Sequence, residues 1–120
     1  ENTAPEIAVR KYLYARGIRY RIHDRKLPGS PDVVVPSSKS VVFINGCFWH
    51  GHDCKHGLIK AKKNRRFWAT KIVANQKRDR RKTRELKQLG WHVEVVWECE
   101  TSHVSRLQAL ARSISNLRNR

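Results

Sequence analysis

The chain has 120 residues, which is enough for one domain with a modest hydrophobic core. It carries 26 lysine and arginine residues against 10 acidic ones, so its formal charge of +16 favours a polyanionic partner such as nucleic acid over a membrane surface. The three cysteines are an odd number, which a secreted disulfide framework would not leave, and no signal peptide opens the chain. We therefore expect a cytoplasmic protein whose cysteines bind metal. Since the chain starts at Glu1 and contains no methionine, we also expect a trimmed fragment.

The first part of the chain predicts a helix followed by a strand. Residues 3–6 have the pattern of a capping box, with a threonine cap, an early proline and a glutamate three positions after the threonine. We expect the helix to run to about Arg16 and Gly17 to adopt the left-handed conformation that ends it. Residues 18–22 alternate between apolar and basic, which predicts a half-exposed strand.

Two short apolar runs follow a turn at residues 27–31. Residues 32–35 predict a strand that Pro36 ends, and residues 36–39 form a short hairpin connection to a second strand at residues 41–44. Because both runs are apolar, we expect central strands that are buried on both faces.

The second half predicts two helices on either side of a fourth strand. Residues 55–63 are expected to be a loop, and Asn64 to cap a long helix that ends at Leu89, before Gly90. Residues 91–97 alternate and predict the strand. Apolar residues at three- and four-residue steps predict a closing amphipathic helix: Val104, Leu107, Leu110, Ile114 and Leu117. The order α-β-β-β-α-β-α predicts a single α/β domain over residues 1–120, with a mixed central sheet flanked by helices.

The long helix and the loop before it are strongly basic. Residues 55–87 hold 14 of the 26 lysine and arginine residues and only two acids, Asp79 and Glu85. A solvated helix usually alternates its charges, so this one-signed block indicates contacts with phosphates. Trp68 and Ile72 are expected on the buried side of the helix. The candidate DNA contacts within the block are Lys62, Lys63, Arg65 and Arg66. Four histidines are assigned to the surface without a role: His23, His56, His92 and His103.

One short segment concentrates metal-binding side chains. Cys47, His52 and Cys54 lie close together in sequence, and Cys99 follows the fourth strand. Three thiolates and one imidazole would close the tetrahedral shell of a structural zinc ion. The alternatives are three buried cysteines that act as small apolar residues, or one adventitious disulfide.

Asp32 stands out among the few acids. It follows Pro31 and opens an apolar strand, where its commoner role would be to bond the backbone of its own turn. The next strand ends at residues 43–45, beside Asp32 if the two strands pair. An acid on one strand with metal-binding groups on its neighbour is typical of Mg²⁺-dependent phosphodiester cleavage, because Mg²⁺ prefers oxygen ligands.

At this point a resemblance to a known family can be stated. Residues 31–32, the string FINGCFWHGHDC at residues 43–54 and the string VVWEC at residues 95–99 resemble the very-short-patch-repair (Vsr) DNA mismatch endonucleases, a branch of the restriction-endonuclease-like PD-(D/E)XK superfamily. The resemblance extends over residues 3–99. It implies a bacterial, nucleoid-associated enzyme that nicks duplex DNA 5′ to the T of a T:G mismatch left by deamination of 5-methylcytosine, with catalytic Mg²⁺ and structural Zn²⁺.

The resemblance also implies roles for single residues. Asp32 and the backbone carbonyl of Ile44 would bind Mg²⁺, Glu6 would support its water shell, and His50 would activate the attacking water. The zinc ligands would be Cys47, His52, Cys54 and Cys99.

Phe48 and Trp49 match aromatic residues that wedge between bases, although core packing is the commoner role of such side chains. Asn45 departs from the family pattern, because the best-known members have a second active-site histidine there. An asparagine cannot transfer protons at neutral pH but can orient a water or a phosphate oxygen.

Two other functions remain open. The chain could be a zinc-stabilised DNA-binding module without catalysis, or a related nicking or restriction-type endonuclease with a different target. Asp32 favours an enzyme, because a binding module has no reason to present an acid to a phosphate. We expect a monomer that acts alongside DNA repair accessory proteins and lacks the family's N-terminal arm.

Overall fold

The structure is a computed structural model that describes residues 2–47, 50, 52 and 65–118. Within these residues the chain forms three α-helices, four β-strands and two short 3-10 helices in the predicted order. The helices are α1 (Ala4–Ala15), α3 (Arg65–Gln88) and α4 (Val104–Arg118), and the strands are β1 (Arg21–Ile22), β2 (Val33–Val35), β3 (Ser40–Asn45) and β4 (His92–Trp97). The 3-10 helices are η1 (Pro36–Ser38) and η2 (Glu98–Glu100). The loop expected at residues 55–63 and the cap at Asn64 lie outside the described residues.

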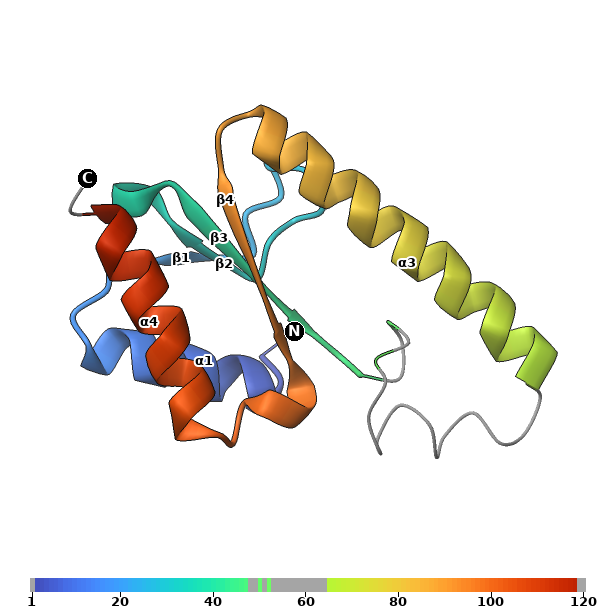
Figure 1. Ribbon diagram of the computed structural model, residues 1–120, viewed down its shortest axis with the longest axis horizontal. Helices are drawn as coiled ribbons and strands as arrows, with labels where there is room; N and C mark the ends of the chain where they lie inside the picture. Colours follow the sequence, from blue (N-terminus) through green and yellow to red (C-terminus); the bar gives the residue numbers. More distant parts are fainter. Residues whose placement is uncertain (1, 48–49, 51, 53–64, 119–120) are drawn as a thin grey trace.

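The four strands form one mixed sheet in the order β1-β2-β3-β4, which confirms the predicted α/β class (Figure 1). β1 and β2 pair antiparallel, as do β2 and β3, whereas β3 and β4 run parallel. Val33 pairs with Val42, and Asn45 pairs with Trp97. This register brings the start of β2 and the ends of β3 and β4 to the same end of the sheet, where the candidate site residues gather.

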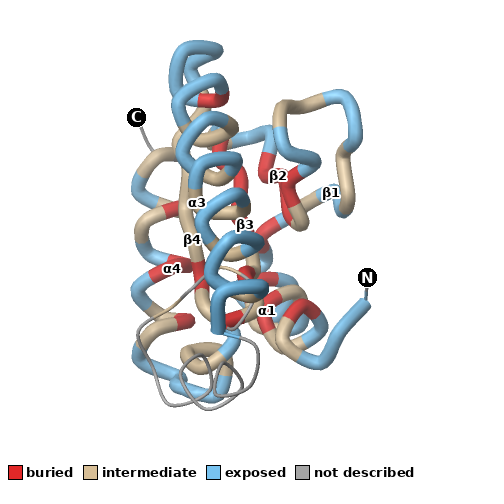
Figure 2. Tube along the Cα trace, turned by 90° about the vertical axis from the view of Figure 1, so that its right-hand side faces the viewer, coloured by how far each residue is buried: buried red, intermediate tan, exposed pale blue. Residues whose placement is uncertain are grey.

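Helices cover both faces of the sheet, as Figures 1 and 2 show. α1 and α4 pack on one face, where the buried cluster includes Val33, Val35 and Val42. α3 packs on the other face, where Leu86 joins Val34, Val41 and Phe43. Successive residues of a strand point to opposite faces, so an all-apolar strand needs cover on both. Every residue of β2 is fully buried, as predicted.

The ends of α1 follow from its sequence, with one change. Thr3 caps the helix by accepting a hydrogen bond from the backbone N–H of Glu6 at 3.5 Å, and Gly17 has the expected left-handed conformation with φ +76°. In a full capping box the glutamate side chain would also accept a hydrogen bond from the backbone N–H of Thr3, and this bond is replaced here. Glu6 Oε2 instead accepts from the backbone N–H of Asn2 at 3.1 Å. The Glu6 side chain is thus turned toward the end of the sheet.

Several predictions about single elements were wrong. The first strand covers only Arg21–Ile22, because the N–H of Ile18 bonds the carbonyl of Leu13 at the end of α1 and its side chain is buried in the core. Val104 was placed in the apolar stripe of α4 but is 59% exposed at the helix start, before α4 reaches the sheet.

The buried side of α3 was also placed too early in the helix. Trp68 and Ile72 are only half-buried, and Leu86 is the one residue of α3 that is buried among those described (Figure 2). Only the C-terminal turns of α3 reach the sheet in Figure 1, so the earlier turns do not pack on the strands of the described part of the chain.

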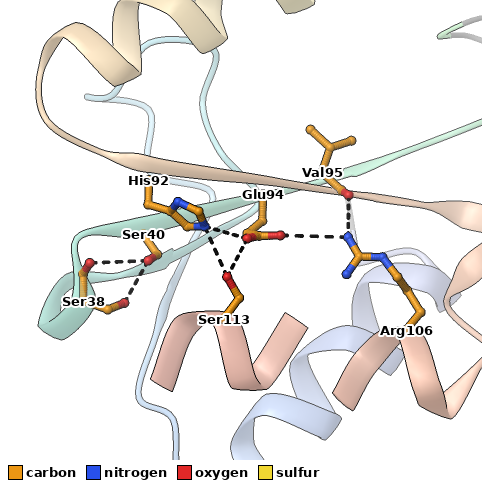
Figure 3. Close-up of polar contacts among 7 residues, drawn as sticks. All are labelled: Ser38, Ser40, His92, Glu94, Val95, Arg106 and Ser113. Carbon is orange, nitrogen blue, oxygen red and sulfur yellow. Dashed lines mark hydrogen bonds and ion pairs between the residues drawn. The ribbon is translucent and has the colours of Figure 1, made fainter. Parts of the chain in front are cut away.

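His92 was expected at the surface without a role; its side chain is 37% exposed, but it takes part in a polar network between β4 and α4 (Figure 3). Its Nε2 lies 2.5 Å from Glu94 Oε2, which also accepts a hydrogen bond from Ser113 Oγ at 2.9 Å. Arg106 donates to the carbonyl of Val95 at 2.9 Å. These bonds satisfy the polar groups that the helix covers. No helix in the described part of the chain is both long enough and apolar enough to cross a bilayer.

Candidate active site

Three side chains from separate segments meet at the end of the sheet. Glu6 on the first turn of α1, His23 just after β1 and Asp32 just before β2 each place a potential ligand atom within 4.8 Å of the other two. Glu6 Oε2 and His23 Nε2 are 3.1 Å apart. The side chains of His23 and Glu6 are 21% and 10% exposed, so the cluster is largely sheltered from water.

Asp32 is held against the neighbouring strand. Its Oδ2 accepts a hydrogen bond of 2.7 Å from the backbone N–H of Ile44, the residue whose carbonyl was expected to be a second metal ligand. Burial raises the pKa of the Asp32 carboxyl above its ordinary value of 3.8, the N–H of Ile44 lowers it, and the nearby charge of Glu6 raises it. Two sheltered carboxylates that disfavour each other's charge form a donor set that suits a divalent cation.

His23 was expected at the surface without a role, yet it belongs to this cluster. The backbone N–H of His23 bonds the carbonyl of Asp32 at 3.2 Å, continuing the register that pairs Ile22 with Val33. His23 has φ +48°, a left-handed conformation that is uncommon for any residue other than glycine. The signal that could have found it is this strand register, which requires β1 to be paired correctly with β2.

A second candidate pair joins His50 to Asp79 on α3. His50 Nδ1 is 2.5 Å from Asp79 Oδ2, and both side chains are 22% exposed. Gln76 on the previous turn of α3 donates to the backbone carbonyl of His50 at 3.4 Å, and Lys82 Nζ lies 3.2 Å from Asp79 Oδ1. An ionised carboxylate only accepts, so Nδ1 of His50 is the donor in this contact, and in the neutral imidazole Nε2 then carries the lone pair. His50 is not part of the Glu6–His23–Asp32 cluster among the described residues.

Asp79 was therefore missed as a site residue, since it was counted only as one of two acids in a basic helix. Its position in the sequence gives no indication of its contact, because 29 residues separate it from His50. The signal is its charge, because an acid retained within a block of cations has a local reason to be there.

Three of the four expected zinc ligands are described, and they lie together. Cys47, His52 and Cys99 place their ligand atoms within 4.8 Å of one another, and Cys99 Sγ is 3.5 Å from His52 Nδ1. Cys47 is fully buried. Two thiols and an imidazole match the soft donors that zinc prefers. The fourth expected ligand, Cys54, lies outside the described residues.

Trp97, the last residue of β4, supports both histidines. Its ring stacks on His52 with centroids 4.2 Å apart and planes 12° from parallel. It also meets His50 edge-on at 6.2 Å. The geometry therefore couples the zinc-type cluster to the histidine of the candidate catalytic pair through one aromatic side chain.

An open cavity of about 920 Å³ lies between the end of the sheet and α3. Asn45, His50, Trp97 and Asp79 are among its lining residues. Asn45 is 6% exposed, so it is a buried neighbour of His50 and not a surface residue. Cations of α3 also line this cavity: Arg80, Arg84 and Lys87. Such a cavity has the charge that attracts a phosphate backbone.

The remaining expected site residues divide into two groups. Phe48, Trp49, Lys62 and Lys63 lie outside the described residues. Arg65 and Arg66 are exposed at the start of α3, far along the helix from the turns that contact His50.

Comparison with known proteins identifies the family. The family model described as DNA mismatch endonuclease Vsr matches residues 1–56. The type II nicking enzyme V.XorIIP of Xanthomonas oryzae pv. oryzae is 48% identical over 114 residues, which cover 95% of this chain and 83% of that protein.

Two further relatives extend the match. The type II nicking enzyme V.NmeAIP of Neisseria meningitidis is 45% identical over 120 residues, covering 97% of this chain and 85% of that protein. The DNA mismatch endonuclease Vsr of Escherichia coli is 43% identical over 98 residues, covering 82% of this chain and 62% of that protein. The chain belongs to the Vsr family of DNA mismatch endonucleases and is an endodeoxyribonuclease.

Proposed function

We propose that this endodeoxyribonuclease nicks one strand of duplex DNA on the 5′ side of the T in a T:G mismatch, with Mg²⁺ as its catalytic cation. One observation carries the proposal: the carboxylate of Asp32 is fixed on the N–H of Ile44 and faces Glu6 at the sheet end. A relative with 43% identity is named DNA mismatch endonuclease Vsr. We also propose that residues 1–120 form one restriction-endonuclease-like domain that acts as a monomer.

The residues that would hold the cation are Asp32 through its carboxylate, Ile44 through its backbone carbonyl, and Glu6 through the cation's water shell. When bound, Mg²⁺ would neutralise charge on the scissile phosphate and lower the pKa of a bound water. The raised pKa of Asp32 supports this assignment, because a nearby cation would offset both its burial and its repulsion from Glu6.

His50 would accept the proton of the attacking water at Nε2. Asp79 holds the opposite ring nitrogen at 2.5 Å, which fixes both the tautomer and the orientation of the imidazole. Asn45 lines the same cavity and would orient a water or a phosphate oxygen without exchanging protons. Catalysis would thus use one imidazole at this position and not two.

Cys47, His52 and Cys99, together with Cys54, would bind structural zinc. Zinc would tie the end of β3 to η2, which follows β4, and would keep Trp97 against both histidines. In DNA binding, Phe48 and Trp49 would wedge beside the mismatch, where unstacking costs least. The basic residues of α3, with Lys62, Lys63, Arg65 and Arg66 at and before its start, would contact phosphates.

A second candidate function is a nicking endonuclease with another target. It is favoured by relatives that are named type II nicking enzymes, among them two at 48% and 45% identity. The proposal that the chain only binds DNA has less support, because the sheltered pair Glu6 and Asp32 would weaken the attraction to phosphates without a cation.

A nicking assay separates these functions. Matched and T:G-containing duplexes of the same sequence are incubated with Mg²⁺, and wild type is compared with Asp32→Ala. We expect a nick 5′ to the mismatched T by wild type and none by the variant. Equal cutting of matched DNA would contradict the mismatch target, and a variant as active as wild type would contradict the assignment of the cation site. Elemental analysis should find one zinc per chain, and its absence would contradict the four-ligand site.

A further inference from the structure

The cluster at the sheet end contains a nitrogen donor that the Mg²⁺ assignment leaves without a role. His23 Nε2 is 3.1 Å from Glu6 Oε2, and both lie within 4.8 Å of an Asp32 oxygen. Ligands about 2.1 Å from an octahedral ion lie roughly 3 Å apart when adjacent and slightly over 4 Å apart when opposite. The separation of His23 Nε2 and Glu6 Oε2 is that of adjacent ligands, and the Asp32 oxygen lies no more than 4.8 Å from either, against slightly over 4 Å for opposite ligands.

The backbone holds the imidazole in this position. β1 ends at Ile22, and the N–H of His23 bonds the carbonyl of Asp32, so the two residues stay opposite each other across the hairpin. His23 also has φ +48°. A non-glycine residue in this conformation carries a backbone cost, and such residues persist where the surrounding structure requires them.

A purely structural role for His23 would be to partner Glu6. The same Glu6 oxygen also accepts a hydrogen bond from the N–H of Asn2 at 3.1 Å, so Glu6 does not depend on His23 for a hydrogen-bond partner. If His23 served only as the hydrogen-bond partner of Glu6, its Nε2 would also have no need to lie within 4.8 Å of an Asp32 oxygen. The position between two acids is the one expected of a third ligand.

We propose that Nε2 of His23 is a direct ligand of the divalent cation held by Asp32, beside Glu6, so that this site binds Mn²⁺ more tightly than Mg²⁺. The inference rests on the proposed cation site at Asp32 and adds a nitrogen to it. Mg²⁺ prefers an all-oxygen environment with several waters, whereas imidazole suits transition metals. The enzyme would still use Mg²⁺ where Mg²⁺ is abundant, and Mn²⁺ would occupy the site at lower concentrations.

The test measures cation binding directly on zinc-loaded protein without DNA. Electron paramagnetic resonance of free Mn²⁺ gives the Mn²⁺ dissociation constant, and competition with Mg²⁺ gives the second constant. The variant is His23→Gln, whose amide can still donate to Glu6. The matched control is His103→Gln, which makes the same change at an exposed histidine. Thermal unfolding confirms that each variant folds.

We expect His23→Gln to weaken Mn²⁺ binding at least about tenfold, in the range found when groups that support a bound metal are changed. Binding of Mg²⁺ should weaken less, so the ratio of the Mg²⁺ to the Mn²⁺ dissociation constant should fall. Pulsed spectroscopy of bound Mn²⁺ should show coupling to an imidazole nitrogen in wild type and in the His103 control, and none in His23→Gln. An unchanged preference, or a nitrogen signal that persists in His23→Gln, would overturn the inference.

Asp32→Asn separates this inference from the proposed function. If Asp32→Asn abolishes Mn²⁺ binding while His23→Gln leaves it intact, the cation site stands and His23 is not its ligand. If Asp32→Asn leaves Mn²⁺ binding unchanged, the cation site itself is misplaced, and both proposals fail together.

Discussion

The pair formed by His50 and Asp79 gives the sharpest test of the candidate site, through the substitution Asp79→Asn. The change keeps the size of the side chain and removes its charge. Asp79 Oδ2 lies 2.5 Å from Nδ1 of His50 and would thereby leave Nε2 free to act as the proposed base. An amide can donate to Nδ1 as well as accept from it, so the variant no longer specifies the tautomer or stabilises the protonated ring.

The size of the effect follows from the bond that is lost. A hydrogen bond to a charged group contributes about 1.5–3 kcal/mol. With about 1.4 kcal/mol for each tenfold change in rate, the nicking step should slow roughly 10- to 100-fold. Loss of the imidazole itself, in His50→Ala, should cost about 10²- to 10⁴-fold, the usual contribution of a general base. Because Asp79 would act only through His50, adding Asp79→Asn to His50→Ala should change the rate little further.

The assay is single-turnover nicking of a T:G duplex at saturating protein, which separates the rate of the chemical step from DNA affinity. Glu85→Gln is the matched control, because it removes one negative charge from an exposed position of the same helix. Both variants should bind DNA at least as tightly as wild type, and only Asp79→Asn should slow the nick. The reasoning is refuted if Asp79→Asn keeps the wild-type rate, or if it slows the reaction equally in the absence of His50.

Three further predictions concern stability. Burial raises the pKa of Asp32 in the folded state, so the free energy of unfolding falls as the pH rises through that pKa and the carboxyl ionises. Without added Mg²⁺, Asp32→Asn should therefore raise Tm at pH 7 and lose that advantage below pH 3.8, the ordinary pKa of the group. A lower Tm of the variant at pH 7 would contradict this. Gly29→Ala should lower the free energy of unfolding by more than the about 1–2 kcal/mol of a left-handed alanine, because its new Cβ would come within 2.3 Å of the Lys82 side chain. Gly17→Ala, at φ +76°, has no atom within 4 Å of its new Cβ and should cost only the backbone term. Equal losses for the two variants in urea unfolding would exclude the clash. Leu86→Ala should lower the free energy of unfolding by about 2–5 kcal/mol and slow nicking, because fully buried Leu86 packs α3 on the sheet. Leu89→Ala, at a residue that is 54% exposed, should change neither quantity. A small loss of stability for Leu86→Ala would show that α3 packs on the sheet by other contacts.

Much of the architecture could be predicted from local pattern. The apolar runs at residues 33–35 and 41–44 indicated strands covered on both faces, and Gly17 and Gly90 marked where helices end, each with the expected positive φ. These features depend on side-chain periodicity and on backbone sterics, which act over a few residues and are therefore visible in the chain itself. β1 was predicted too long, because the backbone N–H of Ile18 bonds the carbonyl of Leu13 at the end of α1 and not a neighbouring strand.

The sequence by itself determined the basic charge, the order of the elements and the short segment that holds Cys47, His50 and His52. Only the tertiary structure decided that His23 lies beside Glu6 and Asp32, and that Asp79 holds His50 from 29 residues away. Those contacts depend on strand register and on where α3 crosses the sheet. Both are set by the packing of the whole core, so no local pattern contains them.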